Sequence, residues 1–129
     1  MTAVDPSSHR LWAVRGATTV AANDRDQVLE ATSELLGELI SANELQPERI
    51  VSAIFTCTEG LDAEFPAVAA RRLGFNTVPL LCTREIDVPG SLANVIRAMI
   101  HFYGDPGLEP RHVYLREARS LRSDLAAPQ

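Results

Sequence analysis

Three charged residues in this chain could act together on a ligand. Arg15 lies near the end of an apolar run, Glu85 closely follows another, and Arg97 stands between apolar neighbours. Burying a charge is costly unless a partner or a ligand neutralises it. Guanidinium groups bind carboxylates through paired hydrogen bonds, and a carboxylate can accept a bond from a ligand hydroxyl. The set therefore suits a ligand that carries carboxylates and a hydroxyl.

The same residues limit the chemistry that the chain could perform. The sequence contains no nucleophile elbow, no phosphate-binding loop and no metal-binding motif. Compatible catalysis would stabilise charge that develops in a transition state and would hold one conformer of the substrate. This inventory fits simple binding of a carboxylate metabolite equally well.

Each candidate also has an ordinary structural explanation. Arg15 could be a solvated residue at a strand end, and Glu85 and Asp87 could cap a following helix. Arg97 could extend its charged group from the edge of an apolar stripe. Cys82 could be a small core residue. The case for a site therefore depends on whether the fold brings these residues together.

Composition narrows the class of protein. The 129 residues predict one domain, and the net charge of −5 argues against a nucleic-acid surface. No apolar run reaches the length of a membrane span, and the polar start does not resemble a signal peptide. Cys57 and Cys82 form no CxxC pair, which indicates reduced thiols in a cytoplasmic protein without a metal site. All 12 basic residues are arginine, so Schiff-base catalysis by lysine is excluded.

The hydrophobic pattern predicts an α/β fold of one domain over residues 1–129, with flexible tails at 1–10 and 119–129. Apolar runs predict four strands, at 11–20, 50–58, 78–83 and 111–118. Helical spacing predicts one helix capped by Asn23 or Asp24, with Gln27 as the capping-box partner of Asp24. It predicts a second helix over 64–73, with Asp62 as cap and Gly74 at its end. It predicts a third helix that carries Leu92, Val95, Ile96, Met99 and Tyr103. This β-α-β-α-β-α-β order favours one sheet covered by helices, with oligomerisation to cover what remains exposed.

Four segments together resemble one known family. They are VRGATTV, FPAVAARRLG, VPLLCTREIDVPGSLANVIRAMI and RHVYLREARSLR. In order and spacing they closely resemble the monofunctional chorismate mutases of the small trimeric α/β type known from Bacillus-like bacteria, from residue 11 to about 125. The resemblance implies a ferredoxin-like domain with a mixed sheet, assembled as a pseudo-α/β-barrel homotrimer with its sites between subunits. It implies an isomerase that converts chorismate to prephenate by a cofactor-free intramolecular Claisen rearrangement, towards phenylalanine and tyrosine.

The resemblance also implies roles for individual residues. Arg97 matches the arginine at the ether oxygen of the breaking C–O bond, Arg15 an arginine that holds a substrate carboxylate, and Glu85 the acid that accepts the substrate hydroxyl. The remaining positions that match substrate contacts are Cys82, Tyr114, Phe65, Ala67, Leu80, Leu81, Arg71, Leu121 and Arg122, with Phe65 and Ala67 contributed by the neighbouring subunit. The chain departs from many relatives at Val68, where they carry lysine, and at Leu81, where they carry a small polar residue.

Two alternative functions and one geometric condition accompany this interpretation. A trimeric binding or regulatory module for a small carboxylate metabolite could use the same arginines, as could an enamine or imine deaminase of a related trimeric fold. In an ideal strand the side chains of Cys82 and Glu85 point to opposite faces. Both can line one pocket only if the strand ends or bulges near Thr83 or Arg84.

Overall fold

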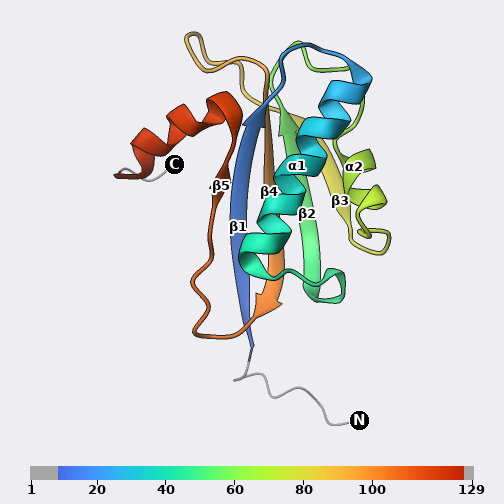
Figure 1. Ribbon diagram of the computed structural model, residues 1–129, viewed down its shortest axis with the longest axis vertical. Coiled ribbons are helices and arrows are strands. Elements are labelled where there is room, and N and C mark those ends of the chain that lie inside the picture. Colours follow the sequence, from blue (N-terminus) through green and yellow to red (C-terminus); the bar gives the residue numbers. More distant parts are fainter. Residues whose placement is uncertain (1–8, 127–129) are drawn as a thin grey trace.

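The computed structural model describes residues 9–126, with side chains described as far as Leu121. A five-stranded mixed sheet lies at its centre, and two α-helices lie against it (Figure 1). The elements in chain order are β1 Arg10–Thr19, α1 Arg25–Asn43, the 3-10 helix η2 Pro47–Arg49, β2 Ile50–Cys57, α2 Ala67–Arg72, β3 Leu80–Arg84, β4 Val95–Gly104, β5 Val113–Tyr114 and the 3-10 helix η3 Arg116–Ala126.

The strands run in the order β3-β2-β4-β1-β5 across the sheet. Central strand β4 pairs antiparallel with β1 and β2, and each outer strand pairs in parallel with its neighbour. This register places Arg97 of β4 between Ala17 of β1 and Thr56 of β2. The predicted single mixed sheet covered by helices is confirmed, and Arg97 lies on its middle strand.

Helix α1 begins where the sequence predicts. The carboxylate of Asp24, the N-cap, accepts a hydrogen bond from the backbone N–H of Gln27 over 3.1 Å. This bond satisfies one of the donors that a first helical turn leaves unpaired. The apolar side of the helix buries Leu35 and Leu39 in the main core, together with Phe55 of β2. The core thus lies between α1 and one face of the sheet.

The segment predicted as a third helix is strand β4. Its burial alternates, because Ile96, Ala98, Ile100 and Phe102 are buried while the residues between them are partly or fully exposed. The helical spacing of Leu92, Val95, Ile96, Met99 and Tyr103 is present in the sequence, but β1 and β2 form hydrogen bonds to this segment along both edges. Pairing on both sides imposes a period of two. Glu85 and Asp87 therefore cap no helix there.

The second helix is shorter than predicted. It spans Ala67–Arg72 with Pro66 at the N-cap, not 64–73. Asp62 does not cap it, because the Asp62 carboxylate accepts a hydrogen bond from the Asn23 side-chain amide over 2.7 Å. Gly74 follows the helix with φ of 103°, as expected for a glycine that ends a helix.

The C-terminal part also differs from the prediction. The strand expected over 111–118 is reduced to Val113–Tyr114. Before it, Asn43 binds the backbone of Arg111, and after it Arg116 adopts a left-handed φ of 52° where the 3-10 helix η3 begins. The tail expected from 119 forms η3 as far as Ala126, beside the β5 edge (Figure 1). Residues 1–8 and 127–129 lie outside the described part, and Arg10, assigned to the first tail, begins β1.

The two faces of the sheet differ. Helices α1 and α2 cover the face that carries Val14, Phe55 and Ala98. Alternation along the strands places Arg15 and Arg97 on the opposite side, which we call the open face. At the β5 edge of the open face, a small cluster of Ala17, Val95, Tyr114 and Ala118 is buried beneath η3.

Candidate active site

Arg97 and Glu85 form an ion pair on the open face. The Nε–H of Arg97 donates to Oε1 of Glu85 over 2.8 Å, with the two side chains 30% and 18% exposed. The second carboxylate oxygen, Oε2, accepts from the hydroxyl of Thr56 over 3.0 Å. The backbone N–H of Glu85 donates to the carbonyl of Cys57 over 2.9 Å, which extends the contact between the end of β3 and β2. Both oxygens of Glu85 are therefore held.

The ion pair leaves Arg97 with capacity for a ligand. A guanidinium has five N–H donors in a fixed plane, and the hydrogen bond to Glu85 uses the one at Nε. Among the described residues no other hydrogen bond of the Arg97 side chain is found. The arrangement fixes the plane of a partly buried cation and keeps its terminal donors available.

Arg15 and Tyr114 share the open face with this pair. Ala17, the register partner of Arg97, stands two residues from Arg15, so the two arginines are diagonal neighbours on adjacent strands. Tyr114 is the partner of Ala17 on the other side and is buried with it. We call Arg15, Glu85, Arg97 and Tyr114 the open-face group, which combines two guanidinium groups, one carboxylate and one phenol on one face of the sheet.

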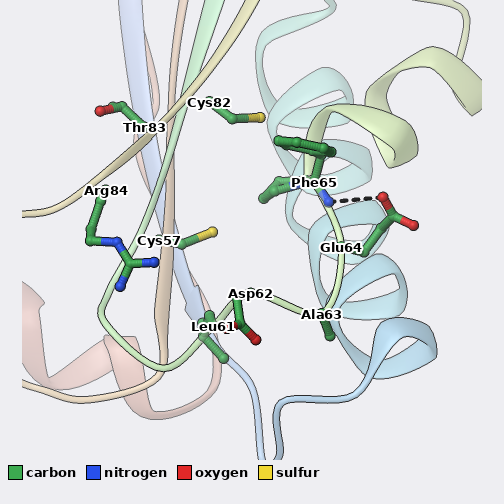
Figure 2. Close-up of a pocket in the computed structure, with 10 residues that line it drawn as sticks. Cys57, Leu61, Asp62, Ala63, Glu64, Phe65, Cys82, Thr83 and Arg84 are labelled. Atoms are coloured by element: carbon green, nitrogen blue, oxygen red, sulfur yellow. Dashed lines mark hydrogen bonds between the residues drawn. The ribbon is translucent and has the colours of Figure 1, made fainter.

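A separate pocket of about 410 Å³ opens between β3 and the segment before α2. Figure 2 shows the thiols of Cys57 and Cys82 extending toward the segment that carries Phe65, whereas Thr83 points the other way. Phe65 is 66% exposed although it is a large aromatic side chain. We call this the Phe65 pocket.

The thiols of the Phe65 pocket are held in the neutral form. Burial, with smaller contributions from Cys82 and Glu85, raises the pKa of Cys57 to about 11. Burial also raises the pKa of Cys82, against the opposing effects of the Ala67 backbone N–H and of the Arg71 charge. Neither side chain is therefore a thiolate nucleophile at neutral pH, because reactivity requires the ionised form.

The structure separates Cys82 from Glu85. Cys82 is the partner of Phe55 on the helix-covered face, while Glu85 bonds to Arg97 on the open face. Strand β3 pairs with β2 without interruption from Leu80 to Arg84, so no bulge turns the two side chains together. The open-face group and the Phe65 pocket consequently lie on opposite sides of one sheet.

The other predicted site residues divide between core, surface and these two groups. Ala67 and Leu80 belong to or pack against the main core, and Arg71 lies close enough to Cys82 to influence the pKa of its thiol. Leu81 is 59% exposed and lies on the open face, as the partner of Ile54. Leu121 packs against the Tyr114 cluster, whereas the side chain of Arg122 lies outside the described residues.

Sequence reasoning missed two residues that belong to these groups. Thr56 supports Glu85, and the available signal was one of the two hydroxyl residues, Ser52 and Thr56, in the mostly apolar run IVSAIFTC. Arg84 lines the Phe65 pocket beside Cys57 (Figure 2). Its signal was a charge directly after a strand, which alone is typical of a solvated strand end.

Two further observations concern other kinds of site. Within residues 9–126, no group of three or more His, Cys, Asp and Glu side chains is placed to hold a metal ion. No helix in the same part of the chain combines the length and the apolar character needed to cross a membrane.

Comparison with known proteins identifies relatives over nearly the whole chain. The family description "chorismate mutase type I" matches residues 11–125. The chorismate mutase AroH of Thermus thermophilus is 48% identical over 118 residues, which are 90% of this chain and 97% of that protein. The AroH of Bacillus subtilis (strain 168) is 41% identical over 115 residues, which are 88% of this chain and 91% of that protein.

A solved structure agrees with these matches. The chorismate mutase from Clostridium thermocellum superposes with a TM-score of 0.80 at 46% sequence identity, covering 84% of this chain and 98% of that chain. Sequence and fold thus point to the same family over most of the chain's length. The chain belongs to the type I chorismate mutase family.

Proposed function

We propose that this chain converts chorismate to prephenate at a site that two copies build together. One copy supplies the open-face group and the next supplies the Phe65 pocket, within a homotrimer. The observation that carries the proposal is the Arg97–Glu85 pair, a partly buried cation whose plane is fixed and whose terminal donors remain for a ligand.

The rearrangement of chorismate to prephenate is a reaction that a fixed cation would accelerate. Chorismate carries two carboxylates and a ring hydroxyl, and its rearrangement breaks one C–O bond while forming one C–C bond within the same molecule. The electrons move inside the substrate, so no proton transfer, external nucleophile or redox partner is needed. Negative charge grows on the ether oxygen as the C–O bond stretches. A fixed cation at that oxygen binds the transition state more tightly than the substrate and therefore raises the rate.

The other members of the open-face group bind and orient. Arg15 and Tyr114 hold a substrate carboxylate, which selects the folded conformer in which the two reacting carbons meet. Glu85 accepts the substrate hydroxyl and at the same time fixes the guanidinium of Arg97. Thr56 holds the second oxygen of Glu85, so the carboxylate keeps its orientation when the substrate arrives.

The separation of the two groups supports a shared site. Within one chain the sheet itself stands between Cys82 and Glu85, so a single small substrate cannot contact both. Packing the open face of one copy against the Phe65 pocket of another removes this obstacle. The open face also exposes Leu11, Leu81 and Tyr103, which are apolar residues that contact with further copies would bury.

We also propose one domain over residues 1–129 and a cytoplasmic location. The continuous family match over residues 11–125 supports the single domain. Cys57 and Cys82 form no disulfide in the structure, which supports a reducing compartment.

The direct test of function is the loss of chorismate absorbance after purified protein is added, with prephenate identified by chromatography. Turnover without added metal or cofactor supports the proposal. A thermal shift with chorismate but no turnover would indicate a binding module, and deamination of a simple imine would indicate the deaminase alternative. Either result would contradict the proposed reaction.

Mixing two inactive variants tests the shared site. Arg97→Ala damages the open-face group, and Phe65→Glu places a carboxylate in the pocket at an exposed position that the fold tolerates. If each site takes its halves from different copies, random co-assembly restores about one quarter of the wild-type sites. Recovery of about one quarter of the activity supports a site shared between copies. If trimers shown to contain both variants recover no activity, both halves of the site lie in one copy.

A further inference from the structure

We propose that His112 is a positioning residue for Arg15. Nδ1 of its imidazole accepts a hydrogen bond from the backbone N–H of Arg15 over 3.1 Å. His112 belongs to the RHVYL segment, yet it is a member of neither the open-face group nor the Phe65 pocket. The inference rests on the proposed function, because its consequence depends on Arg15 binding a substrate carboxylate.

The imidazole replaces a backbone acceptor that the sheet does not supply. Strands β1 and β5 pair in parallel, and the backbone N–H of Leu115 donates to the carbonyl of Ala17 over 2.9 Å. Continued by one step, this ladder would bring the N–H of Arg15 to the carbonyl of Arg111. That carbonyl instead accepts from the side-chain amide of Asn43 over 2.9 Å. The backbone ladder between β1 and β5 therefore ends before it provides an acceptor for the N–H of Arg15.

The side-chain amide of Asn43 binds both backbone polar groups of Arg111, its carbonyl and its N–H. Besides the bond to the Arg111 carbonyl, Oδ1 of Asn43 accepts from the Arg111 backbone N–H over 2.7 Å. The Asn43 side chain is buried and lies at the end of α1, so the clamp connects the helix to the chain entering β5. Because Arg111 is fixed in this way, the next residue, His112, can present its ring to the edge of β1.

The bond fixes the backbone from which the Arg15 side chain extends. On one side, Arg15 is the register partner of Met99 in β4, and on the other His112 occupies its N–H. Next to it, Gly16 is so closely packed by Leu35 and Leu39 that a Cβ there would lie 2.8 and 2.9 Å from their methyl carbons. Without His112, the β5-side N–H of Arg15 would lose its acceptor in the fold.

The hydrogen bond defines the protonation state of the ring. A backbone N–H donates only to an unprotonated nitrogen, so Nδ1 carries a lone pair and the proton lies on Nε2. Partial burial of the ring and then the charge of Arg15 lower the pKa of His112, and Arg15 on β1 is the charged group found to act on the ring within the described part of the chain. The acceptor is thus present at neutral pH, and protonation on acidification removes it.

The test compares His112→Phe, which removes the acceptor, with His112→Asn, which offers a non-titrating oxygen. We expect His112→Phe to lower kcat/KM about three- to tenfold at pH 7.5, mostly through KM, with the trimer intact. His112→Asn should recover most of this loss. His9→Phe is the matched control, because His9 contacts Arg49 and lies outside the site. It should leave both constants unchanged.

The pH dependence of kcat/KM distinguishes a positioning role of His112 from a purely structural one, which would leave that dependence unchanged. Wild-type kcat/KM should fall on the acid side of the ordinary histidine pKa of about 6.5, because the pKa of His112 is lowered and the ring takes up its proton only there. His112→Asn should stay flat between pH 5 and 7. If kcat/KM fell at the same acidic pH in the wild type and in His112→Asn, the proposal would be overturned.

Two further results separate this inference from the proposed site. If Arg15→Ala costs activity while His112→Phe matches the wild type in KM, the positioning role is wrong and the site stands. If Arg15→Ala is fully active, both fail. Imidazole nitrogen NMR shifts of the wild type do not depend on how the variants fold. A proton on Nδ1 of His112 at pH 7.5 would overturn the proposal, and a proton on Nε2 supports it.

Discussion

Arg97 on the central strand donates a hydrogen bond from Nε to Oε1 of Glu85, 2.8 Å away, at the end of β3. The bond joins β4 to the residue that follows β3, although β2 lies between these two strands in the sheet. Thr56 of β2 bridges the gap by donating its hydroxyl to the other oxygen of Glu85. Three strands thus fix the orientation of one guanidinium, which is the condition for electrostatic catalysis without reorganisation.

Replacing Thr56 tests how much this orientation contributes. Thr56→Val keeps the shape of the side chain and removes the donor to Glu85, and a hydrogen bond to a charged group contributes roughly 1.5–3 kcal/mol. Because Glu85 retains its bond to Arg97, we expect a fall in kcat of about tenfold. Steady-state kinetics measures it, and Thr56→Ser should restore the rate. Thr77→Val, an exposed threonine before β3, is the control. Equal kcat in Thr56→Val and the wild type would show that the bond is dispensable.

Alkylation of Cys57 should depend steeply on pH. The rate should rise about tenfold per pH unit up to a pH near 11, because only the thiolate reacts and burial raises the pKa of this thiol to about 11. Iodoacetamide labelling followed by mass spectrometry of the Cys57 peptide measures the rate. In denaturant the labelling rate of the same peptide should stop rising with pH near the ordinary thiol pKa of about 8.5. A plateau at that lower pH in the folded protein would contradict the burial seen in the structure.

Two glycine substitutions should change stability in opposite directions. Gly16→Ala places a methyl group against Leu35 and Leu39 in the core and should lower the free energy of unfolding by about 1–3 kcal/mol. Gly37→Ala lies within α1, where an added Cβ meets nothing within 4 Å, so it should raise that free energy by roughly 0.8–1 kcal/mol. Chemical denaturation compares them. If Gly16→Ala were as stable as the wild type, the side chains of Leu35 and Leu39 could shift to accommodate the added methyl group without loss of stability.

Local signals predicted much of the fold. Asp24 as a helix cap, Gly74 after α2 and the apolar run that forms β2 follow from chemistry within a few residues of each position. Strand β4 does not, because the spacing of its apolar residues fits a helix and a strand alike. What decides between them is hydrogen bonding to β1 and β2, which are remote in sequence.

The candidate site shows the same division. Residue types at positions 15, 85 and 97 predict a site for a carboxylate ligand. Strand alternation raised the condition on Cys82 and Glu85, and the structure places these two side chains on opposite faces of the sheet. The role of Thr56 depends on the register between β2 and β4, and that of His112 on where Asn43 diverts the chain. Neither relationship leaves a pattern within one segment, so contacts of this kind emerge only from the folded chain.

The most direct test of the central claim is the rate of chorismate conversion by Arg97→Ala beside the wild type, without added cofactor. Loss of one preorganised donor costs about 3 kcal/mol of barrier, and loss of a cation should cost at least that. We therefore predict that kcat falls roughly a thousandfold or more, while the exposed-arginine control Arg72→Ala stays active and both variants keep the wild-type assembly. If Arg97→Ala turned over chorismate at the wild-type rate, electrostatic catalysis by the Arg97 guanidinium would be contradicted.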